Sequence, residues 1–109
     1  MNNDYYVVLC TCPTAQIANQ LAKQLIIDKL AACVNVLPNL VSHYSWQGQL
    51  TSDAECLLII KTTKDNYENL EHAIKTQHPY ECPEIIALPI AQGAQNYLSW
   101  ITQQIDNLT

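Results

Sequence analysis

The sequence has 109 residues, 14% of them charged and 49% hydrophobic, with a net charge of −5 and five lysines but no arginine. This balance excludes the basic face that nucleic-acid binding needs, and no apolar run approaches the roughly 20 residues of a membrane span. The length predicts one domain over residues 1–109 with a core of its own. Because an average soluble domain carries roughly 25% charged residues, the low charge predicts that part of the surface is buried against other copies of the chain.

The first half of the chain predicts two strands around a helix. Residues 5–12 are apolar on both faces and lack Gly and Pro, as in a central strand. A Pro-Thr pair then opens a helix that ends near residues 30–32. Its apolar stripe consists of Ile17, Ala18, Leu21, Ala22 and Leu25. Residues 33–47 predict a long strand bent at Pro38, and a proline in a strand indicates a sheet edge or a bulge.

The second half begins with a hairpin turn at Gln47-Gly48. Residues 55–63 predict the return strand, which is apolar, lacks proline and is therefore central. A second helix is predicted over about residues 66–77, with Asp65 or Thr63 as its N-cap.

The end of the chain predicts a fourth strand and a third helix. Residues 84–90 contain Pro89, which indicates an edge strand. The apolar stripe of the last helix is Ala94, Tyr97, Leu98, Ile101, Ile105 and Leu108. The order β-α-β-β-α-β-α places proline in the second and fourth strands only. It predicts an α+β, ferredoxin-like sandwich with an extra C-terminal helix and an antiparallel sheet in the order 4-1-3-2.

Residues 78–84, His-Pro-Tyr-Glu-Cys-Pro-Glu, link the second helix to the fourth strand and are called the connector below. A proline pushes the residue before it out of the helical region, so His78 should end the helix. The connector holds an imidazole, a phenol, a thiol and two carboxylates in a stiff segment. The plainer interpretation is a helix stop and a turn, with His78 favoured by the helix dipole.

Five cysteines are present, an odd number: Cys10, Cys12, Cys33, Cys56 and Cys82. The first residues of the sequence do not show the apolar run of a secretory signal. We expect reduced thiols without an intrachain disulfide, in a cytoplasmic protein. Cys10 and Cys12 leave the same strand face and can share a soft metal, although buried cysteines more often act as small hydrophobes. Cys33 and Cys56 are interpreted as core residues.

Other polar and aromatic residues carry weaker signals. His43 and His72 are interpreted as surface residues. Tyr44, Trp46 and Trp100 suit a subunit interface, and core packing is the alternative. The sequence shows neither a catalytic triad nor a glycine-rich phosphate loop, so we expect a protein that is not an enzyme.

Several segments together resemble the CutA family of divalent-cation tolerance proteins. They are VVLCTCP at 7–13, DKLAACVNVLP at 28–38, SHYSWQGQL at 42–50, the ECLLIIKTT strand, HPYECPE at 78–84 and YLSW at 97–100. The resemblance runs from about Tyr6 to Ile101. It implies a ferredoxin-like homotrimer that binds copper or another divalent cation.

The resemblance also implies a set of metal ligands. The family's first-strand cysteine corresponds to Cys10, and the second of its two consecutive histidines corresponds to His78. The first of those histidines is replaced here by Gln77, and an amide is a poor copper ligand beside imidazole. A third donor is therefore expected from Gln77, from Cys12 or from another subunit.

Three functions follow from these observations. The leading one is a trimeric, non-enzymatic copper-binding protein of metal tolerance, with neither nucleic acid nor a membrane as partner. The alternative is a trimeric regulatory module like the PII signalling proteins, which would bind a small molecule in the clefts between subunits. The third is an enzyme with Cys10 as nucleophile and His78 as base, which requires the two groups within hydrogen-bond reach.

Overall fold

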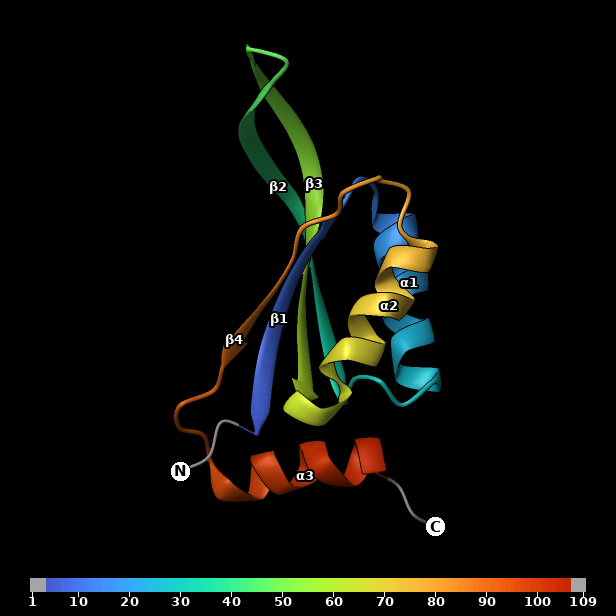
Figure 1. Cartoon of the computed structure of the whole chain (residues 1–109), viewed down its shortest axis with the longest axis vertical. Helices are drawn as coiled ribbons and strands as arrows, with labels where there is room; N and C mark the ends of the chain where they lie inside the picture. The colour runs from blue at the N-terminus through green and yellow to red at the C-terminus, as the bar shows by residue number, and fades with distance from the viewer. Residues whose placement is uncertain (1–3, 107–109) are drawn as a thin grey trace.

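The computed structural model describes residues 4–106 as an antiparallel four-stranded sheet with two helices on one face and a third helix beyond its end (Figure 1). The elements in chain order are β1 (Tyr5–Cys12), α1 (Ala15–Ile27), β2 (Cys33–Trp46), β3 (Gln49–Thr63), α2 (Tyr67–Gln77), β4 (Ile85–Pro89) and α3 (Gln95–Asp106). The element order confirms the fold predicted from the sequence. Leu108, predicted on the last helix, lies outside the described residues.

The strand order is β2-β3-β1-β4, which is the predicted order 4-1-3-2 read from the other edge. Both proline-containing strands lie at the edges. β2 shifts its register against β3 between Leu37 and Leu40, and Asn39 there takes a φ of 65°. The two prolines therefore lie in edge strands, one of them at a bulge, where a missing N–H costs the sheet little.

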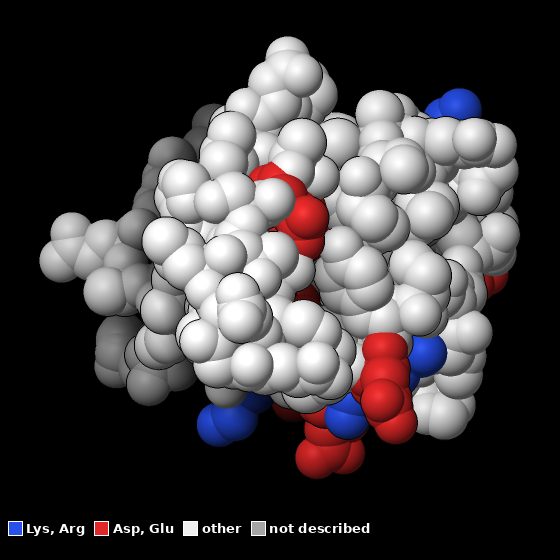
Figure 2. Space-filling model, turned by 90° about the horizontal axis from the view of Figure 1, so that it is seen from above, with Lys and Arg blue, Asp and Glu red and all other residues white. Residues whose placement is uncertain are grey.

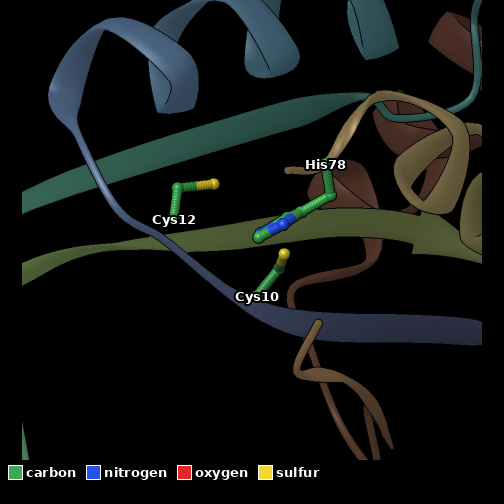
Figure 3. Close-up of side chains that lie close together, drawn as sticks. All are labelled: Cys10, Cys12 and His78. Atoms are coloured by element: carbon green, nitrogen blue, oxygen red, sulfur yellow. The ribbon is translucent and has the colours of Figure 1, made fainter. Parts of the chain in front are cut away.

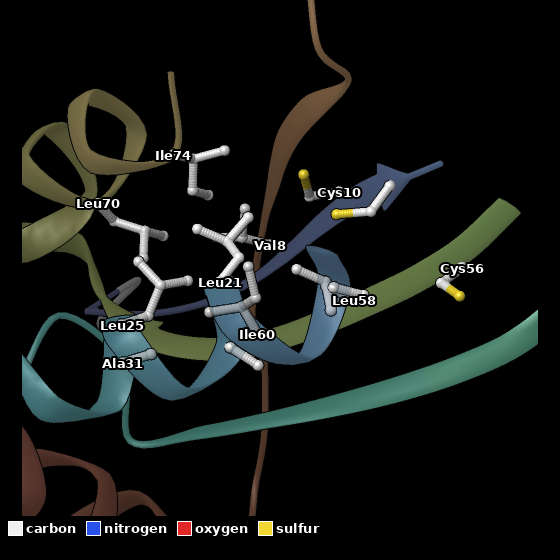
Figure 4. Packing of buried hydrophobic residues seen from close by; sticks show 13 residues of the cluster. Val8, Cys10, Leu21, Leu25, Ala31, Cys56, Leu58, Ile60, Leu70 and Ile74 are labelled. Atoms are coloured by element: carbon white, nitrogen blue, oxygen red, sulfur yellow. The ribbon is translucent and has the colours of Figure 1, made fainter. Parts of the chain in front are cut away.

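The core lies between the sheet and the helices α1 and α2 (Figure 4). Side chains alternate along β1, so that Val8, Cys10 and Cys12 point to the helices and are fully buried. Leu58 and Ile60 do the same on β3. Fully burying an aliphatic side chain contributes roughly 1.5–3 kcal/mol, so this cluster holds the end of β1 firmly in place.

Two predicted boundaries and one predicted core residue were wrong. α1 ends at Ile27, three residues or more before the predicted end, because Asp28 caps it and Lys29 takes a φ of 58°. β3 begins at Gln49 and not at residue 55, since its first half is polar and pairs with β2 far from the core. Cys33 was predicted in the core, but it is only partly buried, opposite Lys61.

The start of α2 also differs from the prediction. A 3-10 turn over Lys64–Asn66 precedes the helix, and Asn66 holds the N-cap position in place of Thr63 or Asp65. Neither Thr63 nor Asn66 caps its helix with a side chain. α1, in contrast, begins with a conventional cap, because the Thr14 hydroxyl accepts the N–H of Ile17 at 3.2 Å.

The sheet face opposite α1 and α2 is called the open face below. It is apolar and largely exposed in the single chain: Leu37, Ile86 and Leu88 are exposed by 44%, 48% and 51%. Beyond the helices, β2 and β3 continue as a bare two-stranded ribbon that ends at the Gln47-Gly48 turn (Figure 1). Between residues 4 and 106, none of the helices is long and apolar enough to cross a membrane.

Candidate metal centre

Three buried side chains converge where β1 ends beside the connector (Figure 3). Cys10 and Cys12 are fully buried, and His78 is 7% exposed. Their ligand atoms, the two Sγ atoms and a ring nitrogen, all lie within 4.8 Å of one another. The structure thus brings together both residues of the predicted metal site and one of the proposed third donors.

The local sequence explains how His78 reaches this place. α2 ends at Gln77, and His78 takes extended backbone angles of φ −81° and ψ 139°, as Pro79 requires. The N–H of His78 still donates to the carbonyl of Ile74 at 2.9 Å. The helix end therefore fixes the backbone of His78, and the extended turn directs its ring toward β1. This confirms the sequence prediction that His78 terminates the helix.

Both ring nitrogens of His78 are engaged by backbone groups. Nε2 lies 2.7 Å from the carbonyl oxygen of Thr11, and Nδ1 lies 3.1 Å from the backbone nitrogen of Tyr80. An amide N–H only donates and a carbonyl only accepts, so Nδ1 must be the acceptor and Nε2 must carry the hydrogen. The ring is therefore held as one neutral tautomer that links β1 to the connector.

The two thiols influence each other's protonation. A hydrogen bond with Cys12, followed by burial, raises the pKa of Cys10 far above its ordinary value, and the negative charges of Glu84 and Glu55 raise it further. The same hydrogen bond lowers the pKa of Cys12, against the effect of burial. The two pKa values therefore move in opposite directions because the two thiols lie close together.

Position favours Cys12 over Gln77 as the third donor. Gln77 is exposed at the end of α2, whereas Cys12 lies in the buried group. Cys33, Cys56 and Cys82 are not part of that group, which is the only one of its kind among residues 4–106. His43 and His72 are exposed, as predicted.

The donor set fits a soft or borderline ion. Two sulfurs that each lie about 2.3 Å from one ion can be at most about 4.6 Å apart, which is close to the 4.8 Å limit of this group. A small movement would therefore let one ion bridge the three donors. Thiolate and imidazole ligands are those that copper and zinc prefer.

A groove of about 880 Å³ borders the centre on the side of the hairpin. It is lined by Thr11, by hairpin residues that include Tyr44 and Trp46, and by most of the connector. Four carboxylates and no lysine line it: Asp53, Glu55, Glu81 and Glu84. Figure 2, viewed from the hairpin end, shows acidic atoms inside a hollow of the surface. The sequence did not single out Asp53 or Glu55, because no local pattern shows that they face the connector in the folded chain.

Tyrosines orient two of these carboxylates. The hydroxyl of Tyr80 donates to Glu55 at 2.8 Å, and that of Tyr44 donates to Asp53. Burial, then the hydrogen bond with Glu55, raises the pKa of Tyr80 well above its ordinary value. The connector is thus tied to β3 through Tyr80 and to β1 through His78.

Known proteins resemble this chain along nearly its whole length. A family model described as CutA1 divalent ion tolerance protein matches residues 6–104. The divalent-cation tolerance protein CutA of Thermus thermophilus is 47% identical over 97 residues, which cover 89% of this chain and 94% of that protein.

Solved structures agree with the sequence match. CutA from Xylella fastidiosa is 38% identical, with a TM-score of 0.93 and coverage of 94% of this chain and 99% of that one. CutA1 from Oryza sativa is 41% identical, with a TM-score of 0.91 and coverage of 94% and 96%. These similarities confirm the family resemblance and the fold that the sequence predicted.

Proposed function

This chain belongs to the CutA1 divalent ion tolerance family, and from that premise we propose that it acts in metal tolerance by binding copper. The observation that carries the proposal is the convergence of Cys10, Cys12 and His78 within 4.8 Å in a buried site. Copper is favoured because two sulfurs and an imidazole suit it better than they suit hard cations such as Mg²⁺ or Ca²⁺.

Binding, and not catalysis, is the proposed role. The Cys10 thiol is directed at the carbonyl of Thr11, 3.8 Å away, and both ring nitrogens of His78 are held by backbone groups. The raised pKa of Cys10 also makes it a poor nucleophile. These contacts favour a ligand set over a nucleophile and its base.

His78 links metal binding to the connector. A metal on Nδ1 takes the lone pair that accepts the Tyr80 N–H. A metal on Nε2 moves the ring hydrogen to Nδ1, and a protonated Nδ1 can no longer accept the Tyr80 N–H. With a neutral imidazole as ligand, the hydrogen bond from Tyr80 is therefore lost whichever nitrogen binds.

Calorimetric titration under anaerobic conditions, with copper in each oxidation state, tests the proposal. Wild-type protein should bind one ion per chain, and Cys10→Ser should bind at least about tenfold more weakly, roughly 1.4 kcal/mol. Cys82→Ser is the matched control, because Cys82 is exposed and outside the group. Undiminished binding by Cys10→Ser would show that copper binds elsewhere.

We also propose that the protein is a homotrimer, with Tyr44, Trp46 and Trp100 at the interface. Trp46 is 62% exposed on the ribbon, and a two-stranded ribbon is only marginally stable in water without a partner. The open face and the unpaired edges of β2 and β4 give a neighbouring copy further apolar surface and strand edges to cover.

Light scattering should give the mass of three 12.3 kDa chains, and Trp46→Ala should weaken the assembly. A single-chain mass would exclude the trimer.

The groove supports a second candidate function, a PII-like module that binds a small molecule. Its four carboxylates and lack of lysine favour a cationic ligand over a nucleotide. A thermal-shift survey of small cations and nucleotides, with wild type compared with Glu55→Gln, would test this function. If no ligand shifts the unfolding temperature, the function is excluded.

We further propose a cytoplasmic location, because all five cysteines are free thiols. Cell fractionation would test that location.

A further inference from the structure

We propose that the copper held at this centre is the monovalent ion, bound by the thiolates of Cys10 and Cys12 and by one nitrogen of His78. The inference rests on the proposed function and adds to it the oxidation state of the ion and the role of Cys12. The family resemblance implies Cys10 and His78 as ligands, and the Cys-Thr-Cys sequence of this chain adds a second thiol, Cys12, on the same strand face.

The types of donor favour the monovalent state. Soft thiolate ligands select Cu(I), whereas Cu(II) prefers a tetragonal arrangement of nitrogen and oxygen donors. The only His, Cys, Asp or Glu side chains of the group are Cys10, Cys12 and His78. Among residues 4–106 no carboxylate joins them to complete a tetragonal set.

Burial limits the number of ligands further. Both cysteines have no exposed surface, and His78 is 7% exposed, so solvent has little access to add water ligands. The amide of Gln77, where the family pattern has a histidine, is on an exposed residue. A site with three donors and little water suits an ion that is stable with few ligands, as Cu(I) is.

The strand fixes the spacing of the two sulfurs. Residues two apart on β1 point to the same side, and core packing around Leu58 and Val8 holds this part of the strand. Because two sulfurs on one ion are at most about 4.6 Å apart, one ion can join them with little movement. Binding forms two copper–sulfur bonds and one copper–nitrogen bond, breaks the hydrogen bond from the Tyr80 N–H to His78, and releases two protons from the thiols, with no change in oxidation state.

The test is an anaerobic competition between the whole protein and a chromogenic Cu(I) chelator. Wild-type protein should take up one Cu(I) per chain, and Cys12→Ala should bind at least about a hundredfold more weakly, roughly 2.8 kcal/mol. Cys56→Ala is the matched control, because Cys56 is also buried on a central strand but lies outside the group. Its affinity should stay within about threefold of wild type.

Three further measurements keep the test decisive. Circular dichroism establishes that the variants fold, and Cys12→Ser replaces Cys12→Ala if the latter does not. X-ray absorption of the loaded protein should show two sulfur neighbours and one nitrogen neighbour around copper, and electron paramagnetic resonance should give no copper signal.

The outcomes separate this inference from the proposed function. Binding of Cu(II) that depends on Cys10, without tight Cu(I) binding, would overturn the inference and leave the proposed function intact. Cu(I) binding that Cys12→Ala does not weaken would also overturn it, because the second thiol would then not be a ligand. Failure to bind copper in either state would remove both.

Discussion

His78 and Thr11, 67 residues apart in the sequence, are joined by a 2.7 Å hydrogen bond from the ring Nε2–H to the backbone carbonyl oxygen. Thr11 lies between the two cysteines of the candidate centre, so this bond fixes the imidazole beside both sulfurs. The same ring accepts the N–H of Tyr80 through Nδ1. The His78 side chain therefore links β1 to the connector at the position of the candidate centre.

Replacing His78 by Ala should destabilise the metal-free protein. The change removes the hydrogen-bond partner of a buried carbonyl and of the Tyr80 N–H, which should cost about 1–3 kcal/mol of unfolding free energy. Urea unfolding at a fixed protein concentration measures it. His72→Ala is the control, because His72 is exposed on α2, the helix that precedes His78, and should change stability by less than about 0.5 kcal/mol. Equal effects of the two changes would mean that the His78 bonds contribute nothing.

Metal binding should expose the backbone N–H of Tyr80 to exchange. With His78 as a neutral ligand, Nδ1 can no longer accept that N–H on either mode of ligation. A hydrogen bond contributes about 0.5–1.5 kcal/mol net, so its loss should speed hydrogen exchange of this amide by roughly twofold to tenfold. The internal reference is the N–H of Ile90, which donates to the carbonyl of Tyr5 at a distance of 2.8 Å. This hydrogen bond does not involve the residues of the centre. An unchanged Tyr80 amide in the metal-loaded protein would mean that His78 is not a ligand.

The sequence predicts much of this centre. Strand alternation places Cys10 and Cys12 on one face, and Pro79 ends α2 so that His78 is extended. The bond from His78 to Thr11 could not be predicted, because it joins segments that only the folded chain brings together. For the same reason the choice of Cys12 over Gln77 as third donor needed the structure.

The fold, too, was predictable from the sequence only where local patterns determine it. Proline placement and apolar alternation predict the strand order, since both depend on local rules. The first half of β3 was missed because residues 49–54 are polar and form a ribbon outside the core, where no apolar alternation is required. The acidic groove likewise arises from Asp53 and Glu55 meeting the connector across the folded chain.

Gln77→His should change copper affinity by less than about threefold. Residue 77 is exposed at the end of α2, so an imidazole placed there should remain in solvent. Chelator competition compares the variant with wild type, and Lys75→His, an exposed position on the same helix, is the control. A gain of tenfold or more in Gln77→His alone would show that residue 77 can turn inward and complete the site.

Tyr80 should make stability depend on alkaline pH. Its folded-state pKa is raised, mainly by burial and then by the hydrogen bond to Glu55, so the neutral phenol is favoured by folding. This contribution is complete below the ordinary tyrosine pKa of about 10 and is lost as the pH rises above it. Tyr80→Phe should therefore lose less unfolding free energy than wild type above about pH 10 in urea titrations. Parallel pH profiles for the two proteins would contradict the role given to Tyr80.

Cys10, Cys12 and His78 should together hold one metal ion. The most direct test is anomalous diffraction, recorded at the copper edge, from crystals grown anaerobically with copper. The predicted result is one strong peak per chain, bonded to the Sγ atoms of Cys10 and Cys12 and to a ring nitrogen of His78. A peak among the carboxylates of the groove, with the three buried side chains free of metal, would contradict the account.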